Sequence, residues 1–154
     1  MANTAKTGYV NGSDLLLKVG GKVIGHCTSH KVTYNSDTKE HTIKPVASAA
    51  ITKALFKGKT VTGMSVSISA EGIKNYDETE NGFKELLAAW YAGASVEVSA
   101  FERESDTTPY LEGNFVISSL EEDDPAQDDS TYSISLENDG DVDITASALT
   151  ENAE

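Results

Sequence analysis

Hydrophobic and polar side chains alternate along most of this chain with a period of two. Met64, Val66 and Ile68 alternate with serines at the intervening positions. A period of two is typical of a β-strand that buries one face and leaves the other in a polar environment. Further strands are predicted on the same grounds in the segments 15–19, 22–29, 95–100, 110–120, 132–137 and 141–145. The chain is therefore predicted to be mainly β.

Glycine-containing signals predict where some of these strands turn. Gly20-Gly21 stands between two short apolar runs, and both positions of a two-residue hairpin turn need positive φ. Residues 138–140, Asn-Asp-Gly, carry a similar signal and predict a hairpin turn between the last two strands. Gly113 is interpreted as a bulge or a close approach of the backbone within its own strand.

One segment, about residues 80–92, has a helical period instead. Its apolar residues recur at the spacing that puts them on one face of a helix. Gly93 follows at the place of a C-terminal cap. The predicted core face of this helix consists of Phe83, Leu86, Leu87 and Trp90. The whole pattern predicts two packed antiparallel sheets, as a β-sandwich or barrel-like fold, with one flanking α-helix.

Residues 35–60 form a long segment without a clean period, and we expect a long arm loop there. Loops of this length inside a compact domain are usually functional or disordered, and the apolar residues of this one argue against disorder. Two interpretations stay open: the arm orders against a neighbouring copy, or it folds back on its own subunit. The candidate inter-subunit residues are Lys39, Lys44, Pro45, Ile51, Leu55 and Phe56.

The length of the chain, 154 residues, fits one ordinary domain. A single domain is therefore expected over 1–154. Its polar end, about residues 147–154, is expected to be frayed.

Charge is distributed unevenly between the two halves of the chain, whose net charge is −13. Residues 1–84 carry eleven lysines against seven acids, whereas residues 85–154 carry a single base, Arg103, against eighteen acids. Either the surface charge merely varies, or the halves form patches of opposite sign that meet between copies. The acidic excess disfavours direct binding to nucleic acid backbones or anionic membranes, and no apolar run is long enough to span a bilayer.

His26, Cys27 and His30 are the densest group of potential ligands or nucleophiles. Zinc needs about four nitrogen or sulfur ligands, and His41 could join the group only if the arm folds back. His26 and Cys27, as neighbours in a strand, face apart. Neither a metal site nor a Cys–His nucleophile pair is therefore predicted, and Cys27 is interpreted as a small core residue.

The acidic stretch 139–143 resembles part of a calcium loop but fails its pattern. The twelfth position requires a bidentate glutamate, and Thr150 stands there. The chain also lacks a phosphate-binding glycine loop and the common hydrolase motifs. No catalytic residue, metal or cofactor is expected, and the chain is predicted not to be an enzyme.

The order of these elements resembles that of the major tail proteins of long-tailed bacteriophages, which form tail tubes. The resemblance spans about Gly12 to Ile144. It rests on the segments 12–20, 61–72, 82–90, 112–120 and 131–140.

The resemblance implies a structural protein whose subunits form hexameric rings that stack into a hollow tube for genome delivery. It implies that the arm reaches neighbouring subunits or rings, and that other tail proteins, such as the tape measure and tail terminator proteins, are partners. DNA is expected to pass through the lumen without specific binding. The expected location is the virion, after assembly in the bacterial host cytoplasm.

An acidic lumen would repel DNA phosphates and let the genome pass. The candidate lining residues are Glu97, Glu137, Asp141 and Asp143. Two other functions stay open. One is the inner tube of a contractile injection particle, which shares this architecture, and the other is a β-sandwich that binds a sugar or protein without assembling.

Overall fold

The computed structural model describes residues 8–42, 56–76, 79–103 and 108–146 of the chain. The seven strands form one sheet in the order β2-β1-β5-β6-β7-β4-β3, and every pair of neighbours is antiparallel. The elements in chain order are η1 (Gly12–Asp14), β1 (Leu15–Val19), β2 (Lys22–Val23), β3 (Cys27–His41), β4 (Gly58–Ile73), α1 (Phe83–Ala92), β5 (Val96–Glu102), β6 (Leu111–Asp123) and β7 (Thr131–Ile144).

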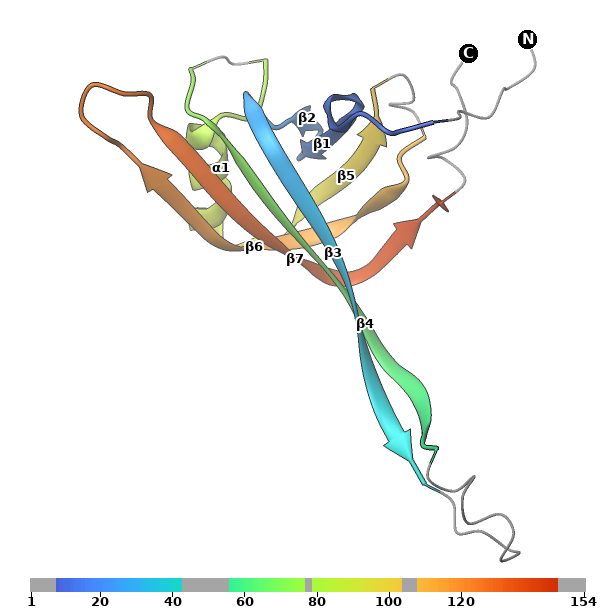
Figure 1. Cartoon of the computed structure of the whole chain (residues 1–154). Helices are drawn as coiled ribbons and strands as arrows, with labels where there is room; N and C mark the ends of the chain where they lie inside the picture. The colour runs from blue at the N-terminus through green and yellow to red at the C-terminus, as the bar shows by residue number, and fades with distance from the viewer. Residues whose placement is uncertain (1–7, 43–55, 77–78, 104–107, 147–154) are drawn as a thin grey trace, which may run out of the picture.

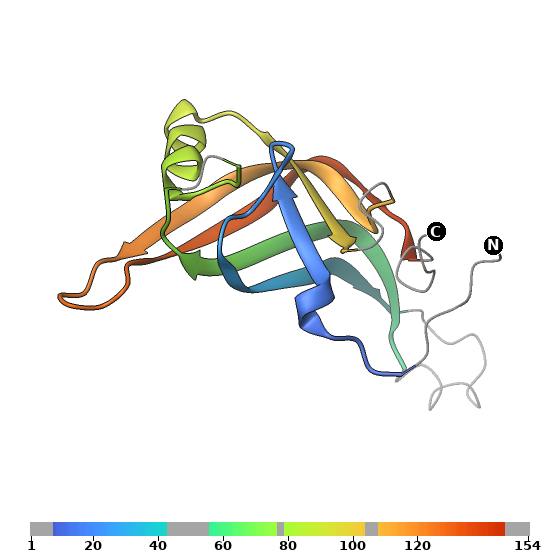
Figure 2. The ribbon, with the colours of Figure 1, turned by 90° about the horizontal axis from the view of Figure 1, so that it is seen from above.

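The sheet curls around its own core, as the view from above shows (Figure 2). The prediction of a mainly β fold with one helix is confirmed. Hydrogen bonds connect all seven strands, so the structure shows the barrel-like form of the prediction rather than two separate sheets. The core is built from alternate strand positions, among them Leu17, Val19, Ile68, Val98, Leu111, Phe115, Ile134 and Leu136.

The turn between β1 and β2 has the predicted chemistry. Gly20 and Gly21 have φ of 62° and 87°, in the left-handed region that residues with a side chain rarely adopt. Lys18 pairs with Val23 and Val19 with Lys22 across the turn. The Gly-Gly prediction is confirmed.

The predicted turn at residues 138–140 is wrong, because β7 runs through it without reversing. Gly113 of β6 pairs with Val142 and Phe115 with Asn138, so the segment 139–141 forms a bulge opposite β6. Gly140 has φ of 88°, and the Asn138 side chain donates a 3.0 Å hydrogen bond to the Gly140 carbonyl. The Asn-Asp-Gly signal bends the strand here, and the irregularity predicted at Gly113 is confirmed.

Only part of the predicted core face of α1 is buried. Leu86 is 1% exposed and belongs to the core, and Phe83 packs against the core. Leu87 and Trp90 are 43% and 48% exposed, so their assignment to the core face is wrong. The helix meets the sheet through the turn that holds Phe83 and Leu86, which leaves the other two side chains outside the contact.

Candidate functional site

The face of the sheet that points away from the core is polar. In β4 the buried residues Val66 and Ile68 alternate with Ser65, Ser67 and Ser69. The strand register carries this alternation to β7, where Ser67 pairs with Glu137 and Ser69 with Ser135. Residues that pair across antiparallel strands point to the same face, so one polar face extends over several strands.

The strand register places three of the four predicted lumen carboxylates on this same face. Asp143 of β7 pairs with Glu112 of β6, and Glu112 pairs with Ser99 of β5, two residues after Glu97. Glu137 pairs with Val116, which shares the parity of Glu112 along β6, so Glu137 points to the same face as Asp143. Asp141 lies in the bulge and has no paired residue on β6. The structure therefore brings Glu97, Glu137 and Asp143 together on one exposed face, with Asp141 exposed in the neighbouring bulge.

Glu112 belongs to this acidic face and was missed in the sequence analysis. It lies between Leu111, which is fully buried, and Gly113, so the alternation of β6 was the signal that could have identified it. Within the described part of the chain, none of the ion pairs involves Glu112 or the four predicted carboxylates. Lys18 and Lys31 also lie on this face, because Lys18 pairs with Ser99 and Lys31 with Ser69, so the face carries an excess of negative charge.

A two-stranded ribbon projects from the sheet (Figure 1). We define the ribbon as residues 34–41 of β3 and 58–66 of β4. The pairing of β4 with β7 starts only at Ser67, whereas β3 and β4 stay paired out to His41 and Gly58. The nine residues of the β4 side span about 30 Å at the usual rise per residue.

The ribbon is held together by its own polar contacts. The Thr60 hydroxyl lies 2.7 Å from Nε2 of His41, and the amines of Lys57 and Lys59 lie 3.3 and 3.7 Å from the carboxylate of Glu40. An isolated two-stranded ribbon is only marginally stable in water. This geometry suits a segment that gains its stability by packing on another molecule.

The structure corrects the prediction of an arm loop over residues 35–60, because 35–41 and 58–60 are strands. Among the candidate inter-subunit residues, Lys39 is exposed on β3, and Phe56 is 84% exposed just before β4. Lys44, Pro45, Ile51 and Leu55 lie outside the described residues, as does the tail at 147–154.

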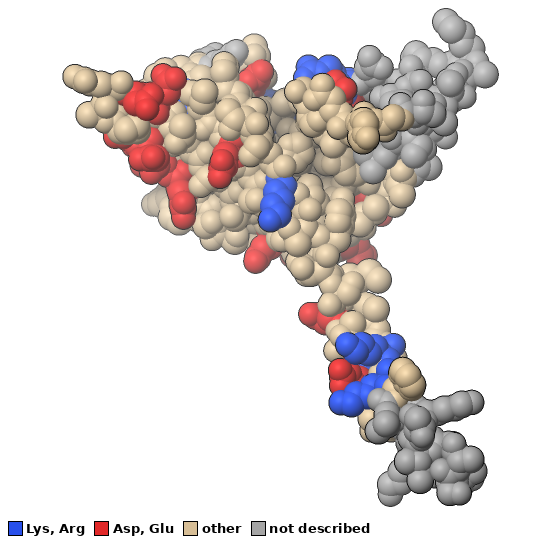
Figure 3. Space-filling model, viewed as in Figure 1, with Lys and Arg blue, Asp and Glu red and all other residues tan. Residues whose placement is uncertain are grey.

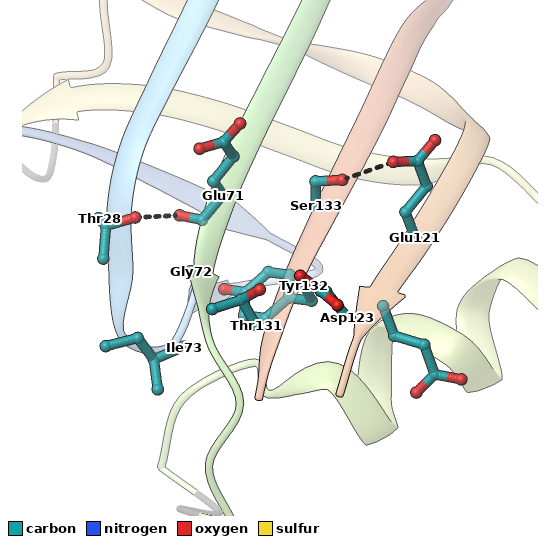
Figure 4. Close-up of a pocket in the computed structure, with 10 residues that line it drawn as sticks. Thr28, Glu71, Gly72, Ile73, Glu121, Asp123, Thr131, Tyr132 and Ser133 are labelled. Carbon is teal, nitrogen blue, oxygen red and sulfur yellow. Dashed lines mark hydrogen bonds between the residues drawn. The ribbon is translucent and has the colours of Figure 1, made fainter. Parts of the chain in front are cut away.

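The opposite end of the sheet is acidic. A pocket of about 280 Å³ opens there across the ends of β3, β4, β7 and β6 (Figure 4). Glu71 and Glu121 both pair with Ser133, so the three residues form a row across the sheet. The Ser133 hydroxyl donates a 3.4 Å hydrogen bond to Glu121. The pocket lining is completed by Thr28, Gly72, Ile73, Glu122, Asp123, Thr131 and Tyr132.

Lys74 fastens the turn between β6 and β7. Its amine donates hydrogen bonds to Glu122 and, at 2.8 Å, to Asp124, and it lies 4.4 Å from the centre of the Phe83 ring. These hydrogen bonds raise the pKa of Lys74, and the bond with Asp124 has the largest effect. The bond from Lys74 also lowers the pKa of Asp124.

The His26–Cys27–His30 group has the geometry of a structural corner. The backbone of His26 takes φ of 49°, its N–H donates to Glu80 at 3.2 Å, and its Nδ1 accepts from Asn75. Burial raises the pKa of the Cys27 thiol and lowers the pKa of His30. Both shifts disfavour the thiolate and imidazolium that a nucleophilic pair would need. Within the described residues, no group of three or more His, Cys, Asp or Glu side chains could hold a metal ion.

Comparison with known proteins identifies the class of protein that this fold and these surfaces define. The family model for phage tail tube proteins matches residues 9–143. The chain therefore belongs to the phage tail tube protein family, which consists of structural components of phage-type particles. A comparison with curated protein sequences gives no significant match.

Solved structures with the same fold come from several tail-like assemblies. A chain in the virion of a native gene transfer agent particle is 19% identical, with a TM-score of 0.69 over 90% of this chain and 100% of that one. A chain in the tail of the empty gene transfer agent particle, which was solved with C6 symmetry, is 20% identical, with a TM-score of 0.68 over the same shares. The SPP1 tail tube is 14% identical, with a TM-score of 0.58 over 95% of this chain and 80% of that one.

The described residues include no helix with the length and apolar character needed to cross a membrane.

Proposed function

We propose that the chain is a single tail-tube domain over 1–154 that assembles into hexameric rings, and that the rings stack into a hollow tube for genome delivery. The observation that carries the proposal is the polar, acidic face on the side of the sheet away from the core. A folded monomer gains nothing from gathering Glu97, Glu112, Glu137 and Asp143 on one face, because the like charges repel. In the wall of a DNA channel, the same negative charge is useful, because it repels DNA phosphates and keeps them from adhering.

The edges of the sheet support ring formation. β3 is an edge strand, and its fifteen residues present backbone groups on the side away from β4. The other edge is β2, with two residues, beside β1. Long open edges pair readily with other strands, and closing the sheets of several copies into a ring satisfies them. The C6 symmetry used for the gene transfer agent tail agrees with six copies per ring.

The proposal extends to partners and location. Other tail proteins, such as the tape measure and tail terminator proteins, would contact the tube, and DNA would pass through it without specific binding. The tube would form in the bacterial host cytoplasm and remain in the virion. The chain would act as a structural part, without catalysis.

A contractile particle is the second candidate setting. A chain in the structure of the sheath/tube terminator of an extracellular contractile injection system is 14% identical, with a TM-score of 0.61 over 91% of this chain and 99% of that one. A sheath gene beside the gene for this chain would favour the inner tube of a contractile particle. Its absence would favour the tube of a non-contractile tail.

The test of assembly is negative-stain electron microscopy of the purified protein over a range of concentration and salt. Rings or hollow tubes are expected. A protein that stays monomeric at all concentrations, even when preformed tail tips are supplied to initiate the tube, would contradict the proposal and favour the non-assembling binding module.

The test of the channel lining replaces Glu112, Glu137 and Asp143 with lysine. Tubes of this variant are expected to retain short duplex DNA at low salt, whereas wild-type tubes do not, because attraction replaces repulsion. The matched control replaces the same residues with Gln, Gln and Asn and removes repulsion without adding attraction. Equal DNA retention by the wild type and the lysine variant would contradict an acidic lining.

A further inference from the structure

Opposite charges lie at opposite ends of the long strand β4. At its Gly58 end stand Lys57 and Lys59, with Lys39 on the neighbouring strand, and we name these three residues the basic end. At its other end Ile73 pairs with Thr131, where β7 leaves the turn that follows β6. The sixteen residues of β4 span about 50 Å, so the two ends cannot meet within one copy.

The acidic end consists of the pocket carboxylates Glu71, Glu121, Glu122 and Asp123 and the turn carboxylates Asp124, Asp128 and Asp129. The surface view shows acidic residues gathered there and lysines along the ribbon (Figure 3). Residues 121–130 hold six acids and no base, whereas residues 38–60 hold five lysines and one glutamate. The difference in net charge between the two ends is therefore large for a domain of this size.

Most of the carboxylates that line the pocket at the acidic end form no ion pair among the described residues, which suits the pocket to receive a basic group. Lys74 neutralises Glu122 and Asp124, which face the turn. Within the described part of the chain, no ion pair involves Glu71, Glu121 or Asp123. The pocket that they line also offers the hydroxyls of Thr28 and Thr131. Carboxylates around a hollow of this kind suit ammonium groups on long flexible side chains.

The basic end is built to reach such a receptor. The ribbon holds it about 30 Å beyond the point where β4 joins the rest of the sheet. Lys57 and Lys59 share one partner, Glu40, and remain 56% and 60% exposed. Two ammonium groups against one carboxylate leave positive charge for a second copy.

We propose that the basic end of one copy docks on the acidic end of a second copy, with Lys39, Lys57 and Lys59 set against the pocket carboxylates Glu71, Glu121 and Asp123. Each copy presents one basic and one acidic end, so the contact is head-to-tail and repeats along the β4 direction. This inference rests on the proposed tube and identifies the surfaces that join successive rings. Because the charges are exposed, the contact weakens as salt rises.

The experiment exchanges the charges on purified full-length protein. The ribbon variant is Lys57→Glu with Lys59→Glu, and the receptor variant is Glu121→Lys with Asp123→Lys. Each is expected to raise the protein concentration needed for tubes about tenfold or more, because like charges then oppose across the contact. The control, Lys84→Glu, reverses an exposed charge on α1, outside both ends and both sheet edges, and is expected to assemble like the wild type.

The combined variant carries all four reversals and is decisive. Among the six contact residues, the ribbon then carries a net charge of −1 and the pocket a net charge of +1, so assembly is expected to recover relative to either double variant. An equimolar mixture of the ribbon and receptor variants is also expected to assemble, since each basic end then finds an acidic one. Circular dichroism of every variant checks that the subunit is folded.

The outcomes separate this inference from the proposed function. If wild-type protein forms no rings or tubes, the proposed function fails. If the wild type forms tubes and the ribbon variant stacks equally well, or if the combined variant does not recover while folded, the head-to-tail contact alone is overturned. Closed dimers of the combined variant, in place of tubes, would also overturn it.

Discussion

Tyr132 joins the start of β7 to the corner between β2 and β3. Its hydroxyl donates a 2.7 Å hydrogen bond to the carbonyl of Gly25, and its side chain is 2% exposed. Burial raises the pKa of Tyr132, so the hydroxyl remains a proton donor over the physiological range. The ring lies against Gly72 of β4, where a side chain would not fit.

Gly72→Ala is predicted to destabilise the subunit by about 1–3 kcal/mol. A Cβ at this position would lie 2.7 Å from Cζ of Tyr132 and 2.8 Å from the backbone oxygen of His26, so strands would have to shift. Urea denaturation measures the effect. Gly12→Ala is the control, because nothing lies within 4 Å of its added Cβ. Equal stability of the two variants would contradict the close packing at Gly72.

Lys74→Met is predicted to lower the melting temperature at neutral pH and to have less effect in acid. Asp124 has a lowered pKa, so its stabilising bond to Lys74 is present above the ordinary value of 3.8 and is lost as pH falls through the lower folded value. Lys74 has a raised pKa, so its contribution is present below 10.5 and is lost as pH rises through the higher folded value.

Thermal unfolding of the wild type and Lys74→Met at pH 7 and pH 2 measures this difference. Lys84→Met, which removes an exposed lysine of α1, is the control. A difference between Lys74→Met and the wild type that is as large at pH 2 as at pH 7 would show that Lys74 acts through packing rather than through its carboxylate partners.

At the scale of elements, α1 shows which features hydrophobic periodicity predicts and which it does not. The helix, its Gly93 cap in the left-handed conformation and the burial of Leu86 follow from the sequence. The exposure of Leu87 and Trp90 does not, because periodicity identifies residues that share a face but not how much of that face its neighbour covers. The width of that contact is set by β6, a strand that is far from α1 in sequence but packs against it.

Leu86→Ala is predicted to cost about 2–5 kcal/mol of unfolding free energy, as large-to-small changes in a core do. Trp90→Ala is predicted to cost less than about 1 kcal/mol, since the indole is 48% exposed and half of it already contacts water. Denaturant unfolding of both variants gives the comparison. A larger loss for Trp90→Ala than for Leu86→Ala would show that the predicted core face was right after all.

The ribbon and β7 show the same limit for strands. Residues 35–41 lack alternation because both faces of the ribbon are exposed at these residues, and a period of two appears only where one face is buried. The Asn-Asp-Gly sequence at 138–140 suits a hairpin turn and a bulge equally, and the continuous pairing of β7 with β6 decides for the bulge. Both features are set by partners far along the chain.

At the scale of the molecule, the sequence revealed an uneven charge but not its placement. The acidic candidates Glu97, Glu137, Asp141 and Asp143 were chosen from strand patterns. The register places three of them on one face together with Glu112, and Asp141 lies in the bulge of β7. The acids of the β6–β7 turn and the lysines of the ribbon could not be assigned to opposite ends without the pairing of β4. Location on one face is thus established, and lining of a lumen stays a prediction.

The most direct test of the central claim is a helical cryo-electron microscopy reconstruction of the assembled protein. Our account predicts a hollow tube whose inner wall is the polar face of the sheet, with Glu112, Glu137 and Asp143 pointing into the lumen and α1 away from it. A tube with these carboxylates on its outer surface, or a compact assembly without a lumen, would contradict the account.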